Sequence, residues 1–198
     1  MSEIGRRPGF GIRHPELLAL LERHSPAATV DEVWADGTLP LRVSAYLGVA
    51  PVPELVSSIR CVVRVDGRFV VCRIPGELHV LPGGRPEPGE TPPRTAVREV
   101  YEETGWHLDP ESLVPLGFLH LRRLVDAPPG HPYPHPDFLQ LVYSGVARTR
   151  AVDADEDWAD LDGWELGTFL ADAEEVVKLG LPPISLAFVD AALQVERT

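Results

Sequence analysis

A predicted helix over residues 92–104 carries acidic side chains in positions that an isolated helix does not favour. Two prolines suit its first turn, and Gly105 is typical of the position just past a helix end. Glu99, Glu102 and Glu103 lie within four positions of one another, so they share one side of the helix and repel. The last two also lie in the final turn, where the helix dipole favours cations. Some positive charge is therefore expected among them.

A divalent cation would remove this conflict, because clustered carboxylate oxygens are the ligands that Mg²⁺ prefers. The alternative is a solvated acidic face, partly neutralised by Arg98, which precedes Glu102 by four residues. The preceding sequence favours the cation. Leu-Pro-Gly-Gly at 81–84 predicts a strand that ends in a bend, where glycines allow the backbone to approach a ligand closely. Glu90 precedes the helix and could fold back toward its carboxylates.

The spacing of these residues resembles the signature of the Nudix hydrolase superfamily. Gly84 is followed after five residues by Glu90, and after seven more by the run REVYEETGW, which begins at Arg98. Every fixed position of the family pattern is filled. The flanking strands and the acidic, Trp-containing segment are also similar to the family's domain, over about residues 56–196. Residues 1–55 are not explained by the resemblance.

The resemblance implies a fold, a reaction and a cofactor. Nudix proteins are α+β, with an α/β/α sandwich around a mixed β-sheet, and they usually cut a nucleoside diphosphate linked to another group. The resemblance therefore implies hydrolysis of a pyrophosphate bond in an NDP-sugar, a dinucleotide or a nucleoside triphosphate, with Mg²⁺ or Mn²⁺. The expected partner is a small nucleotide substrate. Selectivity lies in loops outside the signature, so the substrate-binding residues stay unknown.

The resemblance also implies roles for individual residues. The implied metal ligands are Gly84, Glu90, Glu99, Glu102 and Glu103. Glu90 would act directly or through water, and Gly84 through its carbonyl oxygen. Catalytic roles are implied for Glu99, Glu102 and Arg98. Either glutamate could take the proton of the attacking water, and Arg98 would orient the glutamates by charge-assisted hydrogen bonds. In some family members the base is a loop carboxylate outside the signature.

Polar and aromatic residues outside the signature are further candidates, although each has a simpler structural interpretation. A charged loop offers four possible bases: Asp153, Asp155, Glu156 and Asp157. A proline-rich loop and its end carry metal-ligand residue types: His131, His135 and Asp137. His79 could line the site, and Arg60 and Arg73 could reach phosphates. Trp106 and Trp164 could stack on a base. The simpler interpretations are that the loop acids are solvated, that the histidines are hydrogen-bonded within the fold, that the arginines lie at the surface and that the tryptophans pack in the core.

Apolar periodicity and turn residues predict the remaining elements. Helices are expected at 15–24, 30–35, 92–104, 167–177 and 184–196. Strands are expected at 41–47, 58–65, 68–74, 78–81, 114–124, 138–147 and 164–166. We expect an N-terminal helical and strand extension at residues 1–55 and a Nudix domain at 56–198. The extension is predicted either to form a homodimer or to close the substrate pocket.

Asp66-Gly67 between two apolar runs predicts a hairpin with a two-residue turn. Counting outward from that turn places Cys61 opposite Cys72, in a hydrogen-bonded pair that is poorly suited to a disulfide. Two reduced, half-buried thiols are therefore expected.

The charge distribution limits the classes of partner. The net charge is −12, and residues 151–198 hold twelve acidic against two basic residues. Residues 1–150 are nearly balanced, with eighteen acidic and sixteen basic residues. No basic stripe could follow a nucleic-acid backbone, which argues against tight binding to long DNA or RNA. No segment approaches the roughly 18 apolar residues of a membrane span, and the N-terminus lacks a secretory h-region. We therefore expect a cytoplasmic protein without a membrane partner.

Two other functions stay open. A Nudix-like sensor would bind nucleotides without turnover. The intact glutamates argue against such a sensor, whereas the extension argues weakly for it, because such additions can recruit partners. An altered reaction, such as isoprenoid isomerisation, would need active-site Cys and Glu residues in a context that Cys61 and Cys72 do not provide.

Overall fold

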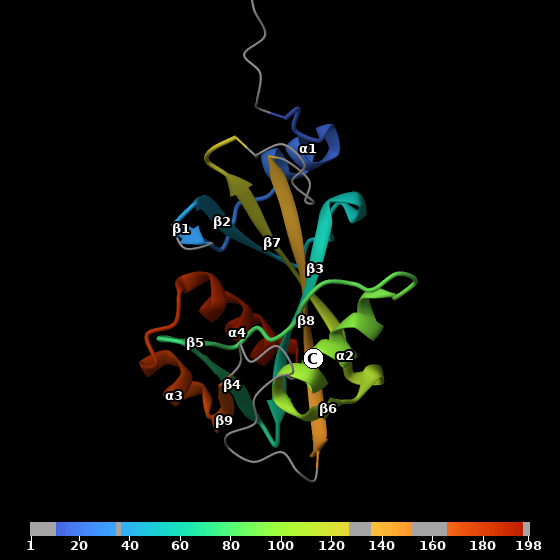
Figure 1. Cartoon of the computed structure of the whole chain (residues 1–198), viewed down its shortest axis with the longest axis vertical. Coiled ribbons are helices and arrows are strands. Elements are labelled where there is room, and N and C mark those ends of the chain that lie inside the picture. Colours follow the sequence, from blue (N-terminus) through green and yellow to red (C-terminus); the bar gives the residue numbers. More distant parts are fainter. Residues whose placement is uncertain (1–10, 35–36, 127–135, 152–165, 196–198) are drawn as a thin grey trace, which may run out of the picture.

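A computed structural model describes residues 11–34, 37–126, 136–151 and 166–195 (Figure 1). The helices are α1 (Pro15–Arg23), α2 (Pro92–Thr104), α3 (Ala173–Lys178) and α4 (Pro183–Val195), and the short 3-10 turns are η1 (Pro53–Leu55) and η2 (Pro110–Ser112). The strands are β1 (Ala28–Trp34), β2 (Leu39–Leu47), β3 (Val56–Val65), β4 (Arg68–Ile74), β5 (Glu77–His79), β6 (Trp106–Leu108), β7 (Val114–Arg123), β8 (Asp137–Arg150) and β9 (Gly167–Ala171).

The strands form a mixed sheet in the order β1-β2-β7-β8-β3-β4-β5, while β6 pairs with β8 and β9 pairs with β4. The central pair, β3 and β8, is parallel, and the other pairs are antiparallel. β3 is apolar over most of its length because both of its faces are covered. Its odd-numbered residues, such as Ile59 and Val63, pack toward α2, whereas Val62 packs in the cluster that includes α4.

Helices therefore cover both faces of the sheet, and α2 and α4 lie on opposite sides of β3 and β8 (Figure 1). The cluster under α2 contains Ala96 and Val100, and the cluster under α4 contains Phe188 and Val189. This arrangement confirms the predicted α+β fold, an α/β/α sandwich around a mixed sheet. Within the described residues, no helix combines the length and apolarity needed to cross a membrane.

The N-terminal residues continue the same sheet. β2 pairs with β7 from Leu41 opposite Arg123 to Leu47 opposite Gly117. α1 buries Leu17 and Leu20 in a separate cluster with β2, β7 and β8 residues. The division into residues 1–55 and 56–198 stays a prediction, and the two parts share one sheet.

Two predicted elements are wrong. The helix expected at 30–35 is a strand as far as Trp34, because β1 uses Thr29, Val30 and Val33 in an antiparallel ladder with β2. Residue 35 lies outside the described residues. The helix expected at 167–177 begins only after Asp172, since β9 first pairs with β4. Asp172 and Glu175 form a capping box that marks the true start of α3. β6 was not expected, and the strand predicted at 164–166 falls largely outside the described residues. The other predicted helices and strands are confirmed within three residues at most boundaries.

The predicted hairpin turn is confirmed, but its register does not continue as far as the cysteines. β3 and β4 pair only through Val65 with Arg68 and Arg64 with Phe69. Farther out, Cys61 pairs with Tyr143 of β8, and its backbone N–H donates to the Pro82 carbonyl, 2.9 Å away. Beyond these two residue pairs, β4 instead pairs with β5 and β9. Both cysteines are reduced and fully buried, so the expectation of free thiols is confirmed and that of half-burial is wrong.

Candidate functional site

Arg98, in the middle of α2, links the carboxylates of the signature. Its Nη1 donates to Glu99 Oε1 and to Glu102 Oε2, each 2.9 Å away. Its Nε and Nη2 donate to the two oxygens of Glu90, at 2.8 and 2.9 Å, and Nη2 also donates to the Arg85 carbonyl at 2.9 Å. The planar guanidinium thus holds three carboxylates and the loop before the helix in one arrangement.

Glu90 is held by several donors besides Arg98. Its Oε2 also accepts from Thr95 Oγ1 and from the Glu87 backbone N–H, both at 2.9 Å. The Arg98 bonds, followed by the Glu87 amide, lower the pKa of Glu90 to about 2. Glu90 is therefore ionised under all ordinary conditions and fixes the loop against the helix.

Glu99 lies against the glycine bend. A side chain on Gly84 would bring its Cβ within 2.5 Å of the Glu99 carboxylate, so the Glu99 side chain would have to move to make room for it. Burial raises the pKa of Glu99, although Arg98 opposes this effect. A carboxylate with a raised pKa is suited to accept a proton from water.

Gly83 and Glu103 connect the bend to the end of the helix. The Gly83 N–H donates to Glu103 Oε2 at 2.7 Å, and the Arg60 guanidinium donates to the Gly83 carbonyl. Gly83 adopts φ +141°, and a Cβ there would lie 2.1 Å from the Ile59 carbonyl oxygen. The bend thus depends on glycine for its backbone conformation and for its close approach to β3.

The structure therefore brings the predicted site residues together around the bend and the helix: Gly84, Glu90, Arg98, Glu99, Glu102 and Glu103. In the described ranges, no three His, Cys, Asp or Glu side chains form a ready-made metal cluster. Arg98 lies between Glu99 and Glu102 and supplies the positive charge that the sequence required. The available donors are carboxylate and carbonyl oxygens, and the Glu99 carboxylate lies directly against the Gly84 backbone, so the chemistry of the residues fits a hard divalent cation.

Two glycine variants should separate the function of the bend from its fold. Gly84→Ala displaces only the Glu99 side chain, so we expect it to lower kcat by about 10- to 100-fold with little change in Tm. Gly83→Ala forces the backbone of β3 to move, so we expect a loss of about 3 kcal/mol in the free energy of unfolding. Urea denaturation and steady-state assays measure the two effects. Equal effects of both variants on stability would contradict this separation.

Other candidates have structural roles in the described part of the chain. Asp137 accepts from Arg13 and contacts His120, away from the signature. Arg73 stacks over Phe169 at 5.0 Å, and Arg150 over Trp106 at 5.6 Å. His79 pairs with Cys72 in the β4–β5 ladder. The remaining candidates lie outside the described residues: His131, His135, Asp153, Asp155, Glu156, Asp157 and Trp164.

The sequence analysis missed Thr95 and gave Arg60 a different role. Thr95 supports Glu90, and its place on the buried side of α2, five residues after Glu90, was the available signal. Arg60 was expected to reach phosphates or to be a surface charge. It instead donates to the carbonyls of Leu81 and Gly83, and an arginine that precedes the bend by more than twenty residues carries no sequence signal for that contact.

Comparisons with known proteins identify the family of this chain. The NUDIX domain model matches residues 54–189. The Bacillus subtilis pyrophosphohydrolase BsRppH, solved as a mutant, superposes with a TM-score of 0.54 at 16% identity, over 85% of this chain and 96% of that one. A Nudix hydrolase from Nitrosomonas europaea superposes with a TM-score of 0.50 at 20% identity, over 69% and 87% of the two chains. No curated protein matches the sequence significantly. The structural neighbours share the fold, and the family model covers most of the chain, so this chain belongs to the Nudix family.

Proposed function

We propose that this Nudix hydrolase cleaves the pyrophosphate bond of a nucleoside diphosphate derivative, with Mg²⁺ or Mn²⁺ as cofactor. The substrate would be an NDP-sugar, a dinucleotide or a nucleoside triphosphate. The observation that best supports the proposal is the Arg98 network, which holds Glu90, Glu99 and Glu102 together, with the Glu99 carboxylate against Gly84.

The proposed ligands are oxygens of Gly84, Glu99, Glu102 and Glu103, with Glu90 as support. The Gly84 carbonyl accepts from the Ile59 N–H at 2.8 Å and has a second lone pair available. Both Glu90 oxygens are already hydrogen-bonded, so we assign Glu90 the supporting role, through Arg98. When bound, a divalent cation would neutralise the phosphate oxygens and ease deprotonation of the attacking water.

The chain's own residues would position and deprotonate the nucleophile. Glu99 or Glu102 would accept the proton of the water as its oxygen attacks phosphorus and the bridging oxygen leaves with the other phosphate. Arg98 holds both carboxylates in place, so it acts as a positioning residue. Glu103 keeps the bend against the helix end through Gly83.

Metal addition and removal test the proposal directly. We expect Mg²⁺ or Mn²⁺ to raise Tm by several degrees, because the ion relieves carboxylate repulsion in the folded state only. Release of nucleoside monophosphate or phosphate from NDP-sugars, dinucleotides and nucleoside triphosphates should depend on the ion and stop with EDTA. K⁺ at matched ionic strength serves as the control for nonspecific screening.

A different outcome would favour the sensor function. Tight nucleotide binding with no product from any substrate class, in either metal, would identify a binding module. An unchanged Tm and no heat of mixing with either ion would contradict the metal site itself.

A further inference from the structure

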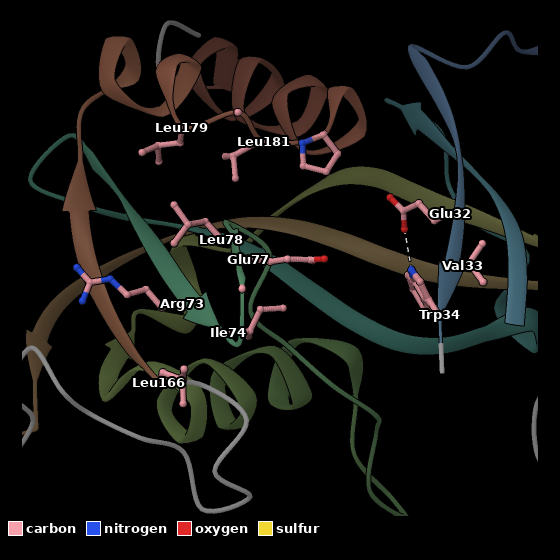
Figure 2. A pocket seen from close by; sticks show the side chains of 13 residues that line it. Glu32, Val33, Trp34, Arg73, Ile74, Glu77, Leu78, Leu166, Leu179 and Leu181 are labelled. Atoms are coloured by element: carbon pink, nitrogen blue, oxygen red, sulfur yellow. Dashed lines mark hydrogen bonds between the residues drawn. The ribbon is translucent and has the colours of Figure 1, made fainter. Parts of the chain in front are cut away.

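A cleft of about 820 Å³ lies beside β5, between the N-terminal strand β1 and the turn that joins α3 to α4 (Figure 2). Its walls include Trp34 of β1, Leu78 of β5 and Leu181 of the turn. This volume is in the usual range for small-molecule sites. None of the signature residues lines the cleft, so it is separate from the carboxylate network of α2.

One wall of the cleft presents a fixed aromatic ring. The Trp34 indole N–H donates to Glu32 Oε2 at 2.7 Å, which orients the ring, and about a third of the residue stays exposed. Leu78, Leu179 and Leu181 provide apolar surface across from β1 (Figure 2). A flat, apolar ring face would be buried favourably between these surfaces.

The charged groups of the cleft select against phosphate. Glu32 and Glu77 enter it from facing sides, and Glu77 extends toward the side of Trp34 (Figure 2). Carboxylates accept hydrogen bonds from N–H and O–H groups and repel anions. Arg73 stacks over Phe169 at the far side, so it does not neutralise this end of the cleft. The cleft is therefore complementary to an uncharged ring with hydrogen-bond donors on its edge.

The chain connects the cleft to the signature over a short distance. Leu78 lines the cleft, and six residues later Gly84 lies against Glu99. Six residues span at most about 20 Å. A substrate that occupies both sites must therefore be long enough to reach from the signature to this cleft.

We infer that this cleft binds the uncharged, donor-bearing ring of the substrate, either a nucleobase or a sugar, stacked on Trp34 and hydrogen-bonded to Glu32 and Glu77. This inference rests on the proposed function for the position of the phosphates. Glu32 and Trp34 precede residue 54, where the family match begins. Strand β1 of the N-terminal extension therefore contributes residues that determine the substrate specificity of the catalytic domain.

Binding of phosphate-free probes by the metal-free full chain tests the inference without turnover. Guanosine and uridine represent the nucleobase, and glucose represents the sugar, in calorimetric titrations with EDTA present. We expect one of the two classes to bind, and Trp34→Ala to weaken that binding at least tenfold. Trp34→Phe keeps the ring but loses the bond to Glu32 and should have an intermediate effect. Glu77→Gln should weaken binding about fivefold.

Glu174→Gln is the matched control, because Glu174 is an exposed acid on α3 that does not line the cleft. It should bind as the wild type does, and all variants should keep the wild-type Tm. Any hydrolysed substrate should show a KM at least tenfold higher for Trp34→Ala, with kcat changed less than threefold. No binding by all three probes, or equal binding by Trp34→Ala and the wild type, overturns the inference. Loss of hydrolysis alone would refute only the proposed function.

Discussion

Glu102→Gln is expected to lower kcat for pyrophosphate hydrolysis by about 10²- to 10⁴-fold. The substitution keeps the size of the side chain but removes the charge that would bind a cation or accept a proton. The Glu102 side chain is 38% exposed and accepts a hydrogen bond from Arg98, and water screens such a pair, so the substitution should cost little stability. The metal-free Tm should be unchanged or slightly higher, because one of three repelling carboxylates is lost.

The rise in Tm on adding Mg²⁺ should shrink in the same variant. Steady-state kinetics and thermal melts with and without the ion measure both effects. Glu111→Gln, an exposed acid in η2, is the control and should behave like the wild type. If Glu102→Gln retained wild-type kcat and the full metal response, Glu102 would have no place in the site.

Asp137→Asn should cause the largest loss of stability among the ion pairs described here. The Asp137 side chain is 2% exposed and accepts a bidentate pair of hydrogen bonds from Arg13, at 2.7 and 2.9 Å. Its Oδ1 also lies 2.7 Å from His120 Nε2. Removing one partner of a buried ion pair leaves the charge of the other partner uncompensated. Because the Arg13 side chain is partly exposed to solvent, we expect the free energy of unfolding to fall by about 2–3 kcal/mol.

The pH dependence of this contribution follows from the direction of the pKa shift. Burial opposes ionisation of Asp137, but the bonds from His120 and Arg13 outweigh it and hold its pKa below the usual 3.8. A carboxylate with a lowered folded pKa stabilises the native state above its usual pKa, and this stability is lost as the pH falls through the lowered value. Urea denaturation between neutral and acidic pH should show a smaller loss for Asp137→Asn than for the wild type, and the loss that stays comes from other carboxylates with a lowered pKa, such as Glu90.

Asp31→Asn provides the comparison, because Asp31 accepts a similar bidentate pair from Arg42 at the exposed surface. Water screens that pair, so its removal should leave the free energy of unfolding nearly unchanged. Equal losses in the two variants would show that burial of Asp137 is not the cause.

The carboxylate site was predictable because its residues are nearly contiguous. The helix period places Glu99, Glu102 and Arg98 together, and the position of Gly84 before the helix follows from the bend. Contacts from distant strands were not predictable. Arg60 reaches the Gly83 carbonyl only because β3 lies beside the bend in the folded chain.

The errors in the predicted fold also come from contacts between distant segments of the chain. Residues 28–34 alternate between half-buried and exposed positions, but Glu32 takes a half-buried position and Val33 an exposed one, so hydrophobicity does not follow the alternation. The strand is defined by its ladder to β2. The cysteine register is wrong because β4 leaves β3 after two residue pairs and joins β9, a pairing between segments almost a hundred residues apart. Local propensity identifies elements, whereas strand partners depend on tertiary contacts.

The seven-residue ladder between β2 and β7 has a practical consequence. A fragment that begins at residue 54, where the family match starts, would lack α1, β1 and β2. Its β7 would become an open sheet edge, and Phe118 and Leu139 would lose the leucines that now cover them. Unpaired edges next to bare apolar side chains promote aggregation. Recombinant expression of the catalytic part therefore needs the whole chain.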